Sequence, residues 1–280
     1  MGKSKERYIT EQEYNAAHSY IPLNCLEIAP YVQIFVDEIT QAMGESEVDS
    51  SLEHNFPIWF QTYARNSIVD ETLVDLSVGP SRSCTVYPDY LVNGYKFHSA
   101  TYDANRSTQS SGVLVKGSNY ADVSHNYYGV LQEVVEIEYT GLKRVVLFKC
   151  EWYDLTPNHG VRTHPTLRLV EVHRSRRYNN YEPFVLAMQA TQVYYLSYPS
   201  MRNDQQEWLA VCCCQPKFAD EETSKDDNDQ GSAEIAFQDG MPTAWVVDDA
   251  IADINNPDDL TGTRFIVEAG PSEEVSSGDD

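Results

Sequence analysis

Long hydrophobic runs and a leader-like N-terminus are both lacking in this 280-residue sequence. No apolar run approaches the roughly 18 residues that a membrane-spanning helix needs. The basic residues that follow Met1 do not lead into the apolar core of a signal peptide. We therefore expect an intracellular protein, nuclear or cytoplasmic, without a membrane partner, whose six cysteines are free thiols in a reducing compartment.

Motifs of the common enzyme classes are also lacking. The sequence has no Gly-x-Ser-x-Gly elbow, no Walker A loop and no dinucleotide-binding glycine fingerprint. Cys150 lies in an apolar stretch, whereas a reactive thiolate needs an accessible, electropositive site, so we expect this thiol in the core. The sequence therefore predicts a protein that is not an enzyme, with no catalytic residue and no cofactor.

Positive charge is scarce, above all near the C-terminus. The chain has 20 Lys and Arg against 43 Asp and Glu, a net charge of −23. This balance argues against DNA binding by the chain as a whole, which depends on neutralising phosphates. Residues 219–280 hold 2 Lys and Arg and 18 Asp and Glu, so we predict an acidic, mostly disordered tail. Two apolar islands within it, Thr243–Val247 and Thr263–Val267, fit either transient structure or docking motifs.

The first eighty residues show the patterns of helices. Thr10 and Glu13 have the spacing of a capping box. Pro30 and Pro57 lie near the expected starts of two amphipathic segments, where the missing N–H of proline costs little. Asp70 is placed to cap a last short helix, which a Gly-Pro pair ends.

Farther along the chain, the pattern changes to that of about seven strands. An Asn93-Gly94 pair is the signal of a type I′ hairpin turn. The continuously apolar run Val145–Phe148 predicts a central strand that is buried on both faces. Residues 183–190 fit either a strand or one or two helical turns. The strand candidates are a hairpin over 90–98 and the segments 111–116, 130–139, 143–153, 161–173, 192–198 and 208–215.

Helices followed by strands predict an α+β fold. We expect N-terminal helices packed beside a strongly bent antiparallel β-sheet or a small, partly open β-barrel, followed by the acidic disordered tail. The predicted boundaries are 1–80 for the helical segment, 81–218 for the β-rich domain and 219–280 for the tail.

Two sets of side chains have the composition of metal sites. His159, His164 and His173 are near one another, and residues 212–214 are three adjacent cysteines. Structural zinc prefers paired cysteines two to four residues apart, and a second pair is lacking. Adjacent strand residues alternate faces, so the first and third of these cysteines point one way and the second the other. We therefore expect small apolar core residues rather than zinc ligands.

Carboxylates offer the other metal chemistry, because a two-metal nuclease needs several acidic side chains at one point. The candidates are Glu133, Glu136, Glu138, Glu151 and Asp154. Glu136 and Glu138 alternate with apolar residues, as on the solvated face of a strand. The pattern therefore favours surface carboxylates.

One basic cluster follows a predicted strand, and Arg162 and Arg168 precede it. Arginine suits phosphate, and an adjacent tyrosine can stack on a base. A solvated loop, or a pairing with the acidic tail, are alternatives that the pattern leaves open. The candidate residues for contact with nucleic acid or an acidic partner are His173, Arg174, Arg176, Arg177 and Tyr178.

Several ordered segments together resemble one family. They are Val92–His98, Thr108–Val113, Tyr127–Leu131, Val146–Asp154, Arg176–Tyr178 and Glu182–Ala187, followed by Gln189-Ala190, Gln192–Tyr195, Tyr198-Pro199 and Trp208. This chain resembles the plant domain of unknown function numbered 4216, which is found beside the transposase of CACTA (En/Spm-type) DNA transposons. The resemblance is strongest over Tyr87–Pro216.

The resemblance implies a transposon-derived accessory module without known activity. It favours a nuclear location and a protein partner, either a transposase or a chromatin component. We therefore expect a non-catalytic interaction module. Direct DNA binding through Arg174, Arg176 and Arg177 is one alternative, and a remnant of a transposase active site is another.

Overall fold

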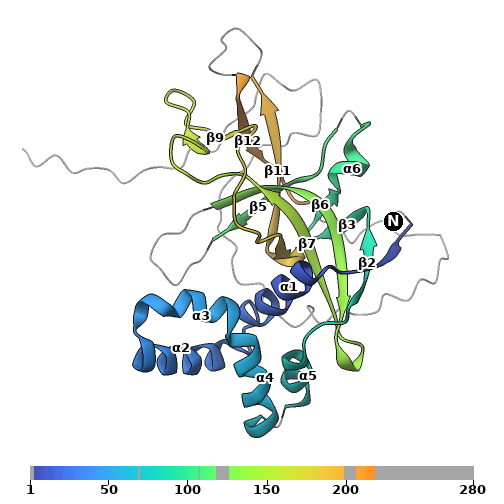
Figure 1. The fold of residues 1–280 in the computed structure, drawn as a ribbon. Coiled ribbons are helices and arrows are strands. Elements are labelled where there is room, and N and C mark those ends of the chain that lie inside the picture. Colours follow the sequence, from blue (N-terminus) through green and yellow to red (C-terminus); the bar gives the residue numbers. More distant parts are fainter. Residues whose placement is uncertain (1–2, 69, 107, 118–125, 199–205, 218–280) are drawn as a thin grey trace, which may run out of the picture.

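The computed structural model describes residues 3–68, 70–106, 108–117, 126–198 and 206–217 (Figure 1). The predicted acidic tail, with both of its apolar islands, lies outside the described residues. Helices form most of the N-terminal part, and a large antiparallel sheet follows. The predicted α+β class is therefore confirmed. In the described part of the chain, no helix is long and apolar enough to cross a membrane.

The helices begin where the capping signals predict. Thr10 and Glu13 form the capping box at the start of α1, each side chain accepting from the other's backbone N–H. Pro30 and Pro57 lie in the first turns of α2 and α4, and Asp70 caps α5. The bounds are α1 (Glu11–Leu23), α2 (Ala29–Met43), α3 (Val48–His54), α4 (Phe56–Ser67), α5 (Glu71–Val78) and α6 (Ala100–Asp103), with 3₁₀ turns at Glu45–Glu47, Thr140–Leu142 and Ala187–Gln189.

Ten of the described strands form one sheet, ordered β1-β2-β6-β5-β11-β12-β9-β8, with β7 pairing both β6 and β10. The order of the described strands begins at β1 and ends at β8, so this sheet does not close into a barrel. The bounds are β1 (Lys5–Tyr8), β2 (Ser83–Tyr87), β3 (Asp89–Val92), β4 (Tyr95–His98), β5 (Gly112–Lys116), β6 (Asn126–Glu138), β7 (Arg144–Trp152), β8 (Val161–Thr163), β9 (Val170–His173), β10 (Phe184–Leu186), β11 (Ala190–Ser197) and β12 (Trp208–Cys213).

Strands β3 and β4 form a separate hairpin. Its two turn residues, Asn93 and Gly94, have φ angles of 52° and 75°. Positive φ at both positions is what a type I′ turn requires, so the predicted hairpin is confirmed.

Strand β6 is long enough to pair with three others. Strand β7 follows one of its edges, while β5 and β2 lie end to end along the other. A register shift between Leu131 and Glu133 interrupts the β6–β7 ladder. Such an extra residue bends a strand and changes which face its side chains reach. Leu131 consequently packs with the β3–β4 hairpin, whereas Glu133 meets the N-terminal segment.

Strand β7 is buried on both faces, as its continuous apolar run predicts. Val145 and Leu147 pack into a core cluster with the helices, and Val146 and Phe148 pack into a second cluster with the β3–β4 hairpin. All four side chains are at most 5% exposed. Figure 1 shows α1 beside the sheet, with α2, α3 and α4 grouped farther from it. A third cluster lies among β9, β11 and β12 at the other end of the sheet.

One predicted strand is wrong in its extent. The pattern over 161–173 predicts a single strand, but β8 and β9 form an antiparallel pair joined by a turn. His164 closes this turn, because its Nδ1 accepts from the backbone N–H groups of Thr166 and Leu167. The ambiguous segment 183–190 contains both predicted forms, the strand β10 and then a 3₁₀ turn.

Strands β1 and β2 have no counterpart among the predicted strands. Strand β1 is short and polar, so it lacks the alternation by which a strand is found in sequence. Its pairing with β2, which follows the five helices of the N-terminal part, brings it into the sheet. The N-terminal segment is therefore helical except for this strand.

Candidate functional site

The predicted contact residues lie in one turn that joins three strand ends. The turn follows β9, where the N–H of Arg174 donates to the carbonyl of Glu207, just before β12, at 2.7 Å. At its other end, the N–H of Tyr178 donates to the carbonyl of Trp152, the last residue of β7, at 3.0 Å. The five residues, His173, Arg174, Arg176, Arg177 and Tyr178, are therefore held close together by backbone contacts. We call residues 173–178 the basic turn.

Arg177 is occupied by partners within the protein. Its guanidinium carbon lies 4.3 Å from the centre of the Tyr153 ring. Its Nε is 3.3 Å from a carboxylate oxygen of Glu151, and its Nη1 donates to the carbonyl of Arg174 at 2.7 Å. The charge and the donors of Arg177 are thus partly used in holding the basic turn against the end of β7.

The other members of the basic turn differ in their exposure. Arg174 is exposed and donates to the hydroxyl of Ser197 at 2.5 Å. Arg176 is also exposed, and its side chain makes no hydrogen bond or ion pair with the residues that the structure describes. His173 is half-buried, with its Nε2 3.3 Å from Glu207 Oε2. Two of the three predicted arginines therefore face solvent.

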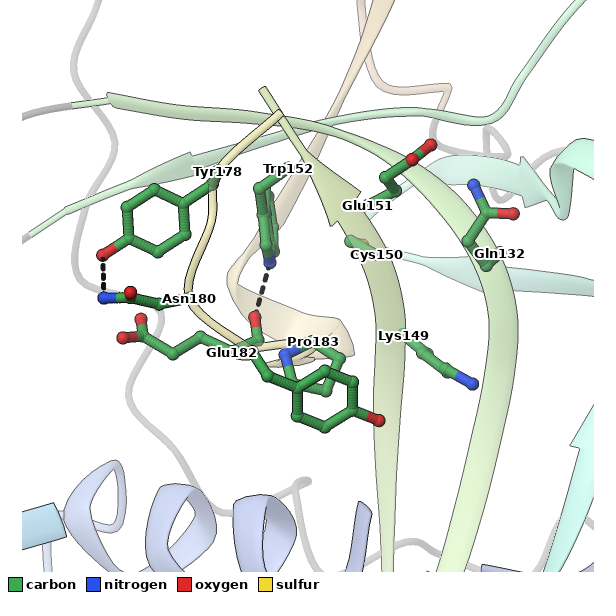
Figure 2. A pocket seen from close by; sticks show the side chains of 10 residues that line it. Gln132, Lys149, Cys150, Glu151, Trp152, Tyr178, Asn180, Glu182 and Pro183 are labelled. Carbon is green, nitrogen blue, oxygen red and sulfur yellow. Dashed lines mark hydrogen bonds between the residues drawn. The ribbon is translucent and has the colours of Figure 1, made fainter. Parts of the chain in front are cut away.

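Tyr178 also lines a groove on the surface beside the end of β7 (Figure 2). The groove has a volume of about 380 Å³. The Trp152 indole donates to the carbonyl of Glu182 at 2.7 Å, and the Asn180 amide donates to the hydroxyl of Tyr178 at 3.2 Å. These bonds fix the loop that forms one wall. The lining residues are Gln132, Lys149, Cys150, Glu151, Trp152, Tyr178, Asn180, Tyr181, Glu182 and Pro183.

The groove offers apolar rings and hydrogen-bonding groups but no activated nucleophile among its lining residues. Burial raises the pKa of the Tyr178 hydroxyl and that of the Tyr181 hydroxyl, so both are neutral at neutral pH. Burial, and then the nearby Glu53, raise the pKa of the Glu182 carboxyl. Burial also raises the pKa of Cys150, which keeps this thiol protonated, as expected for a core cysteine.

Lys149 connects the groove to a cluster of ion pairs. Its Nζ donates to Glu13 at 2.9 Å, and Arg7 donates to both Glu13, at 2.8 Å, and Glu133, at 2.6 Å. Burial would raise the pKa of Glu13, but hydrogen bonds from Arg7, from the N–H of Thr10 and from Lys149 outweigh it and hold the pKa at about 2. The cluster joins β1, α1, β6 and β7, so Lys149 has a structural partner as well as a place in the groove.

The structure gives several of the candidate zinc ligands separate contacts. His164 closes the turn between β8 and β9, and His173 pairs with Glu207. Cys213 packs against the third core cluster, while Cys214 is itself buried. All six cysteines are free. Among the described residues, no group of three or more His, Cys, Asp or Glu side chains is placed to hold a metal ion.

The candidate carboxylates of a two-metal site have individual partners instead of a common point. Glu133 pairs with Arg7, and Glu151 pairs with Arg177. Asp154 accepts from the N–H and the hydroxyl of Thr156. Within the described ranges, these carboxylates do not form a group of three or more side chains that could hold a metal ion.

Most residues of the groove are not among the predicted contact residues. Tyr181 and Glu182 follow the basic turn closely in sequence, whereas Trp152 is distant in sequence and the fold brings it beside them and Tyr178. A signal for two of them was present, since Trp152 and Glu182 each belong to a segment that carries the family resemblance. The groove is where three of those segments meet.

Comparisons with known proteins find a family match for part of this chain. No curated protein and no solved structure matches it. A family model matches residues 135–211, a range that contains β7, the basic turn and every lining residue of the groove except Gln132. Residues 135–211 thus match the family described as Domain of unknown function (DUF4216), which supports the predicted resemblance over this part of the chain.

Proposed function

We propose that this chain is a non-catalytic interaction module that accompanies CACTA (En/Spm-type) transposases of plants. It binds a protein partner, a transposase or a chromatin component, in the nucleus. The transposon association and the nuclear location rest on the resemblance of the segments quoted above. The family match over residues 135–211 supports the same family without naming an activity.

The composition of the groove is the observation that supports binding of a protein partner. Trp152, Tyr178 and Tyr181 line it together with Lys149 and Glu182, so apolar rings stand beside both signs of charge. Tyrosine and tryptophan are enriched in protein interfaces because they combine a large apolar area with a polar group. A phosphate backbone instead favours a surface of uniform positive charge. A peptide with an apolar side chain suits the groove better than a nucleic acid does.

Affinity purification of the tagged full chain from plant nuclei, with and without nuclease treatment, tests this function. We expect a protein partner that is retained after nuclease treatment. Tyr181→Ser, which changes an exposed ring of the groove, should release this partner. Tyr8→Ser is the matched control, because Tyr8 is an exposed tyrosine of β1 that is not part of the groove. Loss of every partner after nuclease treatment would reject the proposal.

Direct DNA binding is the second candidate, favoured by the exposure of Arg174 and Arg176 in the basic turn. If both contact phosphates, Arg174→Gln with Arg176→Gln should reduce the salt slope of DNA binding by about 2. Arg65→Gln on α4 is the control and should leave the slope unchanged. Deletion of residues 219–280 should raise DNA affinity, because a tethered acidic tail competes for the same arginines. Absence of DNA binding at low salt in the tail-deleted chain would end this candidate.

A further inference from the structure

Helices α2 and α4 carry a row of partly exposed aromatic rings, none of which lines the groove. The ring centres of Tyr31 and Tyr63 are 5.7 Å apart, and those of Tyr63 and Trp59 are 4.8 Å apart with the planes 23° from parallel. All three side chains are half-buried. Ile34, one turn from Tyr31 on α2, is 36% exposed. We call Tyr31, Ile34, Trp59 and Tyr63 the arm face.

Buried aromatic side chains and a hydrogen bond hold the arm face in place. Tyr31 packs against Phe60, and Trp59 packs against Phe35, with ring centres 5.7 Å and 5.2 Å apart. Phe35 and Phe60 are at most 2% exposed. The Trp59 indole also donates to a carboxylate oxygen of Glu38 at 2.9 Å. Rings that are already fixed lose little conformational entropy when a partner covers them, which favours binding.

The segment that carries the arm face is rich in negative charge, and two carboxylates lie beside the face itself. Residues 14–64, which include α2, α3 and α4 as far as Ala64, contain seven Asp and Glu and no Lys or Arg, and Arg65 follows in the last turn of α4. Glu38 lies one turn after Ile34 and accepts a hydrogen bond from the uncharged indole of Trp59. Asp37 accepts from the uncharged amide of Gln33. Neither carboxylate forms an ion pair with the residues that the structure describes, so both can pair with a cationic partner.

We propose that the arm face docks a basic segment of a partner protein. An apolar or aromatic side chain of this segment packs on Tyr31, Ile34 and Trp59, and its Lys or Arg side chains pair with the carboxylates around them. A buried apolar centre with a charged rim is the usual anatomy of a protein interface. The sign of the charge selects the partner, since an acidic segment would be repelled. The inference rests on the proposed function only in requiring a protein partner, because the arm face lies outside residues 135–211.

Three synthetic peptides, tested on the full chain, separate the contribution of charge to binding from that of apolar contact. One is a 16-residue amphipathic peptide with a Leu face and Lys on the other positions. The second has Glu in place of Lys, and the third has Ser in place of Leu. We expect the Lys/Leu peptide to bind at least about tenfold more tightly than either of the others. A photo-crosslinking group at its centre should label residues between 27 and 63, as located by mass spectrometry.

Substitutions at exposed positions locate the contact without disturbing the core. Ile34→Ser should weaken binding of the Lys/Leu peptide by about tenfold. Leu91→Ser, at a more exposed apolar position on the β3–β4 hairpin, should leave it unchanged. Glu38→Gln should weaken binding and reduce its salt dependence. Glu71→Gln, at an exposed carboxylate of α5, is the control for charge.

Four outcomes would overturn the inference. They are equal binding of the Glu/Leu peptide, an Ile34→Ser affinity within about twofold of the wild type, crosslinks that map to residues 219–280, and a dimer of the full chain that Ile34→Ser dissociates. The third outcome would show that the acidic tail captures the peptide, and the fourth that a second copy covers the arm face. None of these four outcomes would affect the pull-down test, in which Tyr181→Ser releases a nuclease-resistant partner. Failure of this inference can therefore be distinguished from failure of the proposed function.

Discussion

Lys149 of β7 donates a hydrogen bond to Glu13 of α1 at 2.9 Å and so ties the first helix to the sheet. Glu13 is 2% exposed and also accepts two hydrogen bonds from Arg7 of β1. A buried carboxylate of this kind is stable only because its partners replace the water that it loses. The contact therefore makes the position of α1 depend on charges from two other elements.

Removing the charge of Glu13 should destabilise the fold. Glu13→Gln leaves Arg7 and Lys149 with Glu133 as their remaining shared carboxylate, and we expect the free energy of unfolding to fall by about 1–3 kcal/mol. Glu11→Gln, which removes a carboxylate paired with Arg82 on the exposed side of the same helix, should change it little. Urea denaturation followed by circular dichroism measures both. Equal stability of the two variants would contradict the structural role of Glu13.

The same carboxylate should make stability depend on pH. Hydrogen bonds hold the pKa of Glu13 at about 2 in the folded chain, below its ordinary value of 4.5. Its contribution is therefore complete above pH 4.5 and is lost as the pH falls toward 2. The difference in the free energy of unfolding between wild type and Glu13→Gln should narrow over this range. A difference that stays constant with pH would show that Glu13 is not ionised in the folded state.

Leu147→Ala should destabilise the protein strongly. Leu147 is fully buried between the helices and the sheet, so its truncation leaves a cavity that costs about 2–5 kcal/mol. Leu196→Ala on β11 is the control, because Leu196 is 53% exposed and should shift stability by no more than about 0.5 kcal/mol. Thermal and chemical denaturation of the purified variants give both values. A tolerated Leu147→Ala would mean that β7 is not a central strand.

The arginines of the basic turn should separate into a structural and a surface residue. Arg177→Gln removes the contact with the Tyr153 ring and the pair with Glu151, so we expect a loss of about 1 kcal/mol of stability. Arg176→Gln should be neutral to within about 0.5 kcal/mol, because the Arg176 side chain is exposed. Melting curves of the two variants test the assignment. Similar effects of both substitutions would contradict it.

Removal of residues 219–280 should leave the folded part intact. The segment holds 18 Asp and Glu and only two short apolar islands, too few apolar residues to add much core. We expect the midpoint of thermal melting to shift by no more than about 2–4 °C, the shift that about 1 kcal/mol produces in a domain of about 150–250 residues. Calorimetry of the full and shortened chains measures the shift. A lost transition would show that one of the islands packs on the rest of the chain.

Local signals in the sequence determine the parts of this fold that need few neighbours. Thr10 and Asp70 mark helix starts because a cap satisfies backbone groups within one turn. Asn93 and Gly94 specify the hairpin because two positive φ angles suffice to reverse the chain. The apolar run Val145–Phe148 shows that a strand is buried on both faces, whatever covers it.

Only the tertiary structure decides which distant segments meet. Strand β1 carries no alternation and becomes a strand because β2 supplies its hydrogen bonds. Arg177 has the composition of a phosphate contact in the sequence, yet the end of β7 occupies it. The groove exists because the 178–183 segment crosses beside β7, which brings Tyr178 and Glu182 to Trp152. Residue type and spacing describe a side chain's chemistry, but its available partners depend on chain pairing over long distances in sequence, which no local pattern encodes.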